Sequence, residues 1–243
     1  MAGSIVLTLA LVFSLFSMTM FYLGYRRGEQ VMFLKYARLG YHAMSMMVIA
    51  ASTLLLYIIL THQNQYNYVF NYSNDDLPLG LLLSTFWAGQ EGSFMLWILM
   101  TVLIGIGLQS YTEKRGDLEP RVMMVYTLAT SFLLMMVSPL MKNPFALIWQ
   151  GDNPFVELKY FDMTILQSQA MGFVQNFLFG NDGGSPTHIK VDKDFVGNLT
   201  AAGYQLSDVL IHGKGLNPLL QNFWMQIHPP ILFAGFSATT VPF

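Results

Sequence analysis

The stretch Ser4–Tyr25, SIVLTLALVFSLFSMTMFYLGY, decides the fold class, because it contains 22 consecutive residues without a charge. As one helix it would be roughly 33 Å long, enough to cross the hydrocarbon core of a bilayer. No basic segment precedes the stretch, and it is longer than the apolar core of a signal peptide. We therefore interpret it as a retained membrane-spanning helix.

The composition of the whole chain points the same way. Of the 243 residues, 53% are hydrophobic and 11% are charged, whereas soluble domains carry about 25% charged residues. The net charge of −2 argues against nucleic acid as a partner. The chain has no cysteine, which excludes disulfides, thiolate metal sites and a cysteine nucleophile within it. The composition indicates a membrane protein.

Four further apolar runs follow the first one along the chain. They are Gly40–Thr61, Leu81–Gln109, Val122–Met141 and a run that begins at Ile231. The sequence therefore predicts an all-α polytopic membrane protein with about five transmembrane helices. The last run, Ile231–Phe243, has 13 residues and is too short to span a bilayer unaided, so we expect the fifth helix to be truncated.

Basic residues are concentrated on two connecting segments. They are Arg26, Arg27, Lys35 and Arg38 on the first segment, and Lys114, Arg115 and Arg121 on the second. The positive-inside rule makes residues 26–38 and 110–121 cytoplasmic and places the N-terminus outside. We divide the chain into 1–141, with helices one to four, an extracytoplasmic region 142–230 and the start of helix five at 231–243.

The third run is too long for one spanning helix, since its 29 residues would extend roughly 44 Å. We expect residues 81–92 to form an interfacial or re-entrant piece. Gly89 and Gly92 permit a break in the backbone, and Ser93 can cap the helix that follows.

An acid lies in this segment, which reads FWAGQEGSFMLW from Phe86 to Trp97. Glu91 is flanked by apolar residues, and ionisable side chains in such places need a partner, a polar cavity or an interfacial position. Trp87 and Trp97 are typical of the membrane interface. Glu91 is either a structural acid at the positive end of a helix or a functional group, and the residues alone leave both interpretations open.

The region 142–230 holds most of the polar residues. Thr164–Phe179 has apolar residues at helical spacing, which predicts an amphipathic interfacial helix, and Asp192–Leu210 predicts a second, weaker helix. No GxGxxG, P-loop or HExxH motif occurs.

The five histidines differ in their surroundings. His188 and His212 lie in the polar region without a second ligand at metal spacing, so we interpret them as surface residues. His62 ends the second apolar run and suits an interfacial anchor. His42 lies near the inner end of that run, where a structural hydrogen bond is favoured over ligation.

His228 stands in FWMQIHPPILFAGF, at the start of the fifth apolar run. Pro229 and Pro230 are expected to fix the backbone ahead of the helix and to keep His228 out of helical conformation. A neutral imidazole held beside Trp224 can serve as an axial haem ligand. A purely structural role for His228 remains open from the residues alone.

Four stretches in this order resemble one known family. They are YVFNYSNDDLP (Tyr68–Pro78), FWAGQEGSFMLW (Phe86–Trp97), NPF (Asn143–Phe145), and LNPLLQ (Leu216–Gln221) followed by HPPILFAGF (His228–Phe236). The chain resembles the N-terminal part of the cytochrome c-type biogenesis haem lyase family, CcmF and NrfE. Residues 151–214 are then an insertion, because the family joins NPF to LNPLLQ by a short linker.

The resemblance implies that the chain holds haem b at the outer face of the bacterial inner membrane. The haem is there joined through thioethers to the CxxCH motif of apocytochrome c. It makes His228 an axial ligand of the haem iron, with Pro229, Pro230 and Trp224 around it. Six residues would form a haem platform or docking surface: Trp87, Gly89, Glu91, Gly92, Ser93 and Trp97.

The resemblance also implies partners. These are a haem carrier, apocytochrome c with its thiol-reducing and handling proteins, and a C-terminal portion or separate subunit with the tryptophan-rich motif and the second outer histidine. The chain alone is then part of a haem lyase and not an active enzyme.

Two alternatives of other classes stay open. The chain is a scaffold subunit of the same complex that binds no haem, or a subunit of an ion or proton transporter in which Glu91 and His42 form a relay.

Overall fold

The computed structural model describes residues 2–27, 31–151, 153–179 and 186–241. The chain divides into two compact units. The first combines Met1–Tyr57, Phe86–Pro144 and Pro218–Phe243, and the second combines Ile58–Thr85 and Phe145–Asn217. Each unit is built from segments that are far apart in the sequence.

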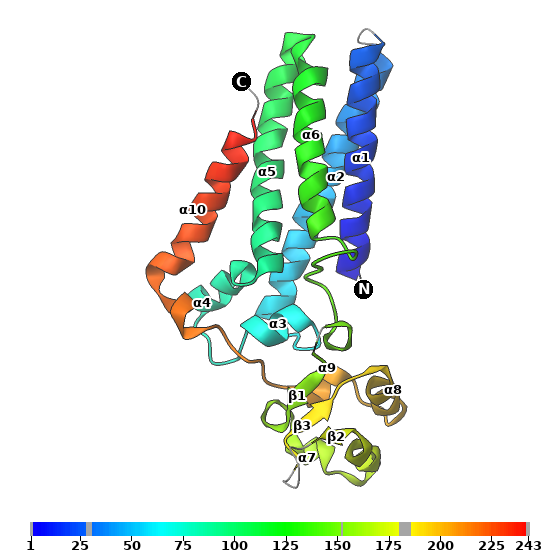
Figure 1. Ribbon diagram of the computed structural model, residues 1–243, viewed down its shortest axis with the longest axis vertical. Coiled ribbons are helices and arrows are strands. Elements are labelled where there is room, and N and C mark those ends of the chain that lie inside the picture. Colours follow the sequence, from blue (N-terminus) through cyan, green and yellow to red (C-terminus); the bar gives the residue numbers. More distant parts are fainter. Residues whose placement is uncertain (1, 28–30, 152, 180–185, 242–243) are drawn as a thin grey trace. The chain divides into compact units, whose positions relative to one another are not determined.

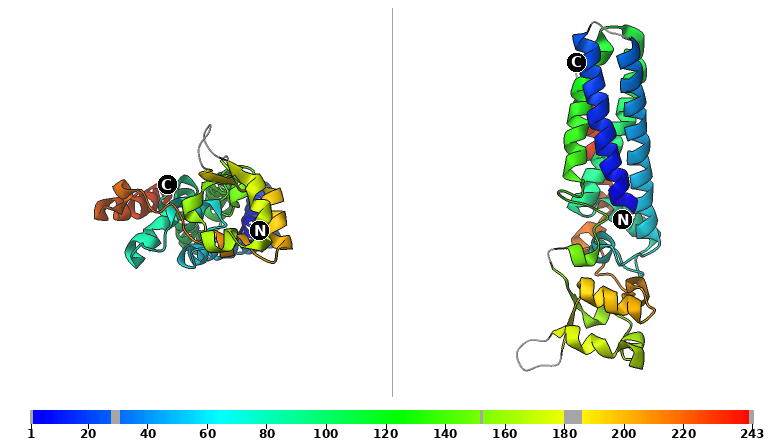
Figure 2. Two further views of the ribbon diagram at one scale, coloured as in Figure 1. Left: turned by 90° about the horizontal axis from the view of Figure 1, so that it is seen from below. Right: turned by 90° about the vertical axis from the view of Figure 1, so that its right-hand side faces the viewer.

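The first unit is a helical bundle. Its main helices are α1 (Ala2–Arg26), α2 (Val31–Leu60, whose last residues belong to the second unit), α5 (Gln90–Thr112), α6 (Leu118–Met136) and α10 (Phe223–Thr239). Short 3-10 turns are η1 (Thr85–Trp87), η2 (Glu113–Arg115) and η6 (Pro218–Gln221). Helices α1, α2, α5 and α6 run side by side, and α10 packs along α5 (Figures 1 and 2).

Three described helices are long and apolar enough to cross a membrane: Ala2–Arg26, Val31–Leu60 and Gln90–Arg115. The predicted fourth and fifth spans are present as α6, with 19 residues, and α10, with 17. Neither is among those three. The structure therefore agrees with a helical membrane protein, and the number of spans stays a prediction.

Small and hydroxyl-bearing residues lie among large apolar side chains in the interior of the bundle. Ser14 and Ser131 share a hydrogen bond of 2.7 Å between α1 and α6, and the Ser17 hydroxyl donates to the Ala37 carbonyl at 2.8 Å. Gly105 lets α5 approach closely, since a methyl group there would overlap the Tyr41 hydroxyl. Small residues at such contacts are typical of helices that associate in lipid.

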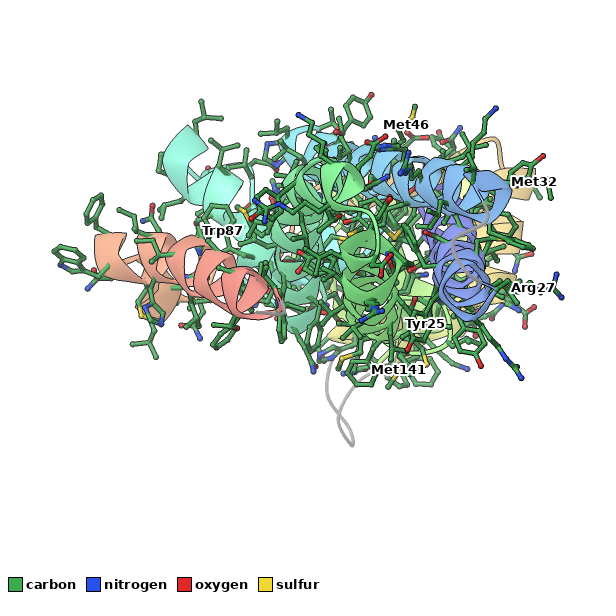
Figure 3. The ribbon with its side chains drawn as sticks, turned by 90° about the horizontal axis from the view of Figure 1, so that it is seen from above. Tyr25, Arg27, Met32, Met46, Trp87 and Met141 are labelled. Carbon is green, nitrogen blue, oxygen red and sulfur yellow. The ribbon has the colours of Figure 1, made fainter. Side chains whose placement is uncertain are left out.

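Large side chains point outward from the bundle. Met32, Met46 and Met141 are each more than half exposed and lie at its rim (Figure 3). An exterior of this kind suits a lipid environment, where apolar contact with the surroundings is favourable.

At one end of the bundle, Arg38 forms ion pairs with two glutamates. Arg38 donates to both oxygens of Glu119, at 2.7 and 2.6 Å, and to Glu113 at 2.6 Å. The Glu119 side chain is only 2% exposed. Bidentate pairing of this kind satisfies a carboxylate that would otherwise be buried without a partner.

The second unit contains short helices and a small sheet. Its elements are α3 (Asn67–Tyr72), α4 (Leu79–Ser84), η3 (Ile148–Gln150), β1 (Phe155–Glu157), η4 (Leu158–Tyr160), α7 (Met163–Leu166), η5 (Gln169–Phe177), β2 (Leu178–Phe179), β3 (His188–Lys190), α8 (Lys193–Ala201) and α9 (Leu206–Val209). The strands are antiparallel in the order β1-β3-β2. This sheet corrects the all-α prediction.

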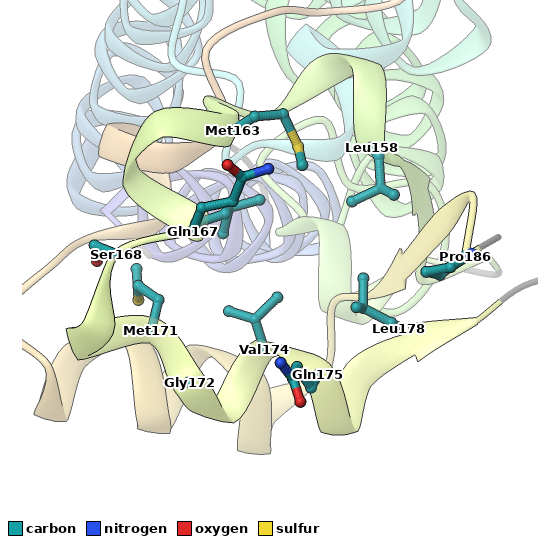
Figure 4. A pocket seen from close by; sticks show the side chains of 11 residues that line it. Leu158, Met163, Gln167, Ser168, Met171, Gly172, Val174, Gln175, Leu178 and Pro186 are labelled. Carbon is teal, nitrogen blue, oxygen red and sulfur yellow. The ribbon is translucent and has the colours of Figure 1, made fainter.

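The predicted helix Thr164–Phe179 is wrong as a single element. The segment forms α7 and η5, and Met171 interrupts the helical backbone with φ −106° and ψ 19°. The apolar side chains of Leu166, Met171 and Val174 are buried in the core of the unit. The turn arises because those side chains have to meet a core built from β3 and α8, rather than one flat surface. A cavity of about 320 Å³ lies between α7 and η5 (Figure 4).

The predicted helix Asp192–Leu210 is also divided. Helix α8 is capped by Asp192, whose Oδ1 accepts from the Phe195 amide at 2.9 Å. It ends before Gly203, which has φ +89°, a conformation that glycine adopts readily. Helix α9 follows after that turn.

Candidate functional site

His228 lies inside helix α10, not ahead of it. The helix begins at Phe223, where the Asn222 side chain accepts from the Trp224 amide at 3.0 Å. It continues through Pro229 and Pro230 to Thr239. The expectation that the prolines keep His228 out of helical conformation is therefore wrong.

The two prolines still modify the helix. Because proline has no N–H, the Met225 and Gln226 carbonyls lack the donors that a regular helix would supply four residues later. Proline inside a helix is tolerated where neighbouring structure holds the backbone. The asparagine cap at one end of α10 and the contacts with α5 at the other supply that support.

The C-terminal half of α10 is fixed to α5. Thr101 and Ser237 are fully buried, and their hydroxyl groups lie 3.0 Å apart. The Trp97 ring lies 5.8 Å from that of Phe233 and 5.5 Å from that of Phe236, between ring centroids. Sequence reasoning missed Thr101 and Ser237, although hydroxyl residues within apolar helices were a signal that was available.

The N-terminal half of α10 leans away from α5 (Figure 1). His228 is exposed there, and in the part of the chain that the structure describes it makes no hydrogen bond or ion pair. Trp224 is 74% exposed and precedes His228 by one helical turn, so both side chains share a face. An imidazole and an indole are thus presented together, with the Trp224 ring edge-on to that of Phe223 at 5.4 Å between centroids.

The segment Phe86–Trp97 contains the expected break, at Gly89, but the helix that follows begins three residues before the expected Ser93. Helix α5 begins at Gln90, with Gly89 as its N-cap in extended conformation. Gly92 is buried inside the first turn. Ser93 does not cap the helix, because its hydroxyl donates backward to the Trp87 carbonyl at 3.0 Å.

Glu91 is the acid of the first turn of α5. Its side chain is partly buried, and no ion pair or hydrogen bond to it occurs among the described residues. The positive end of a 23-residue helix favours a carboxylate at this position. A structural role, as an acid at the positive end of the helix, is therefore sufficient to account for Glu91.

Trp97 belongs to a packed aromatic cluster. Its ring stacks near Phe94, at 6.5 Å between centroids, as well as near the two phenylalanines of α10. Its indole nitrogen is buried without a hydrogen-bond partner. Among the six proposed platform residues, Trp97 has ring contacts with the helix that carries His228, and no hydrogen bond or ring contact among the described residues joins any of the six to His228.

The remaining histidines lie on other elements of the chain. His42 is exposed on α2 with its ring edge-on to Tyr41. The Asp75 carboxylate faces His62 at 3.4 Å and His212 at 3.1 Å, a juxtaposition that the sequence did not reveal. His188 lies on β3, with Nδ1 2.8 Å from the Thr187 hydroxyl. No cluster that would hold a metal ion through three such side chains is present among the described residues.

Comparisons with known proteins fit these observations. No family model matches the chain. NrfE of Escherichia coli K12, a probable cytochrome c-type biogenesis protein, is 22% identical over 204 residues, 84% of this chain and 26% of that protein. The cytochrome c-type biogenesis protein CcmF of Pseudomonas fluorescens is 23% identical over 195 residues, 78% of this chain and 20% of CcmF.

A solved structure decides the relationship. The cytochrome c haem lyase CcmF superimposes with a TM-score of 0.54 at 28% identity, over 59% of this chain and 24% of that one. The chain is similar to CcmF and NrfE in sequence, and to CcmF in fold over 59% of its length. It spans about a quarter or less of the length of the CcmF and NrfE proteins that it matches.

Proposed function

We propose that this chain holds haem b at the outer face of the bacterial inner membrane, as one part of a CcmF-like haem lyase in cytochrome c maturation. The observation that carries the proposal is the exposed His228 on α10, in a chain related to CcmF and NrfE. Histidine is a common axial ligand of haem iron.

The residues present fit one side of a haem site. His228 has a free imidazole among the described residues, and Phe223 and Trp224 expose apolar rings one turn away. Aromatic and aliphatic side chains provide the packing surface that a macrocycle requires. His228 would hold the haem iron through its imidazole, and other parts of the lyase would complete the site.

Haem, when bound, supplies vinyl groups across which the apocytochrome thiols add, each giving one carbon–sulfur bond and one carbon–hydrogen bond. This chain has no cysteine, so both sulfurs have to come from the CxxCH motif of the substrate. The work assigned to its own residues is to bind and orient, with His228 holding the iron and Trp224 and Phe223 packing beside it.

The partners follow from the same proposal. They are a haem carrier, apocytochrome c with its thiol-reducing and handling proteins, and the C-terminal portion or subunit that carries the tryptophan-rich motif. Trp87, Glu91 and Ser93 would serve as a docking surface on the outer side, while Trp97 would anchor α10.

The test is the visible spectrum of the membrane complex purified through this chain. We expect a low-spin haem signal that His228→Ala weakens or shifts. His42→Ala is the matched control, because it removes another exposed histidine of the same unit, and it should leave the spectrum unchanged. His228→Gln keeps a polar side chain of similar size and distinguishes loss of ligation from loss of packing.

Two results would contradict the proposal. A haem signal unchanged in His228→Ala would remove His228 as the ligand. Absence of haem in every preparation, with the C-terminal partner present, would favour a scaffold subunit.

A further inference from the structure

The second unit contains a small polar cavity of about 210 Å³. It is lined by three asparagines and a lysine, Asn67, Asn71, Asn153 and Lys214, and by the apolar side chains of Phe70, Ile148 and Phe155. It lies apart from the larger cavity between α7 and η5 and shares no residue with it.

The side-chain oxygens of all three asparagines are already occupied within the wall of this cavity. Asn71 Oδ1 accepts from the Lys214 ammonium at 3.0 Å, and Asn67 Oδ1 accepts from Asn71 Nδ2 at 3.0 Å. Asn153 Oδ1 accepts from the Phe155 amide at 3.0 Å. Each of these oxygens therefore already accepts one hydrogen bond within the wall.

The polar groups of the wall that have no partner among the described residues are hydrogen-bond donors. Lys214 has two further ammonium protons, and Asn67 and Asn153 each have an amide nitrogen without an acceptor in the described part of the chain, which omits residue 152. No carboxylate lies within 4 Å of Lys214 among those residues. Glu157, whose pKa is lowered mainly by a hydrogen bond from Lys159, is already paired with that lysine at 2.6 Å.

Lys214 is held in place by its backbone. Its amide donates to the Phe70 carbonyl at 2.7 Å, and the next residue, Gly215, donates to Ser73 at 3.0 Å. Gly213 approaches Ser73 so closely that a Cβ would overlap the Ser73 carbonyl. The ammonium also lies 5.2 Å from the centre of the Phe70 ring. The donor set is therefore fixed before any ligand arrives.

We propose that this cavity is a carboxylate-binding site. A donor-rich wall with one ammonium group, which has no carboxylate within 4 Å among the described residues, matches a monoanionic acceptor. A dianion such as phosphate would leave its second charge unmatched, and the apolar walls of Phe70, Ile148 and Phe155 suit the hydrocarbon next to a carboxylate. The inference is independent of the haem proposal, since it concerns a different site.

The experiment measures binding of hexanoate to the whole chain in detergent by calorimetry or NMR. Hexanoate should bind, whereas hexanamide, which has the same length without the charge, should bind at least about tenfold more weakly. Lys214→Gln should weaken hexanoate binding by a similar factor, and Lys214→Arg should retain part of it. Lys193→Gln, an exposed lysine on α8 outside the cavity, is the control for charge and should have no effect.

A second pair of probes distinguishes a porphyrin propionate from a free monocarboxylic acid as the group that binds. A metal-free porphyrin with two propionates that binds in a Lys214-dependent manner, while its dimethyl ester does not, identifies a propionate as the group recognised. Hexanoate binding without Lys214-dependent porphyrin binding identifies a free monocarboxylic acid. Equal binding of hexanoate and hexanamide, or no Lys214-dependent binding of any acid, would overturn the proposal.

Discussion

Both units of the molecule bury large apolar side chains, but most of the buried serine and threonine lies in the bundle. The bundle buries serine and threonine, such as Ser14 and Thr130, beside large apolar side chains such as Phe21, and it exposes further large apolar side chains on its helices. The second unit places phenylalanine, leucine, isoleucine and valine inside and exposes ion pairs such as Lys159 with Glu157. The bundle thus combines internal hydroxyl groups with an apolar exterior, whereas the second unit has an apolar core and ion pairs on its surface.

The difference has a physical cause. In lipid, the surroundings are as apolar as the side chains, so helices associate through close contact and hydrogen bonds rather than by removing apolar area from water. In water, removal of apolar area is the main driving force. The contrast supports the interpretation that the bundle is adapted to a membrane and the second unit to an aqueous phase.

The largest expected effect tests the core of the second unit. Phe195 is fully buried, with its ring 5.4 Å from that of Phe177 and 6.0 Å from that of Phe173. Phe195→Ala should lower the free energy of unfolding of this unit by about 3–5 kcal/mol, because a cavity replaces the ring. Hydrogen exchange would report faster opening of α8 and β3.

Phe179→Ala is the control, because that ring is 44% exposed and less buried area is lost. Exchange in α1 and α6 should stay unchanged in Phe195→Ala. Equal loss of protection in α1 and α6 would show that the bundle and the second unit do not unfold independently.

A smaller effect tests close packing in the bundle. A methyl group on Gly105 would overlap Tyr41, so Gly105→Ala should lower the free energy of unfolding in detergent by about 1–3 kcal/mol. Gly107→Ala lies on the same helix with no atom near the added methyl, and it should be neutral or stabilise the bundle by up to about 1 kcal/mol. Equal melting temperatures of the two variants would show that close approach at Gly105 is unimportant.

The smallest effect concerns a helix cap in the second unit. The hydrogen bond from the Phe195 amide, with Lys190 3.2 Å away, lowers the pKa of Asp192. Asp192→Ala should lower the free energy of unfolding by about 1 kcal/mol at neutral pH. Because the folded pKa lies below the unfolded one, the contribution is complete above the unfolded pKa of about 3.9 and is lost as the pH falls through the folded value.

Chemical denaturation of the second unit at several pH values measures this change. Asp194→Asn is the control, since Asp194 is an exposed acid in the first turn of the same helix. A difference between the wild type and Asp192→Ala that persisted unchanged below the folded pKa would rule out the charged cap as the cause.

Local signals predicted part of the candidate site. The glycines of the segment 86–97 indicated a break, which the structure has at Gly89. The prolines after His228 were misread, because proline disfavours a helical residue before it and yet α10 continues through both. Contacts of Trp97 and Ser237 hold the far end of that helix, and such contacts outweigh a local preference.

By itself, the sequence determined the membrane class, the helical bundle and the relationship to CcmF and NrfE, because long uncharged runs and short motifs are local properties of the chain. Tertiary structure alone decided which side chains meet. Asp75 faces His212 across 137 positions, and Lys214 donates to Asn71 across 143. No local pattern records such pairs, since they depend on how distant segments pack against a shared core.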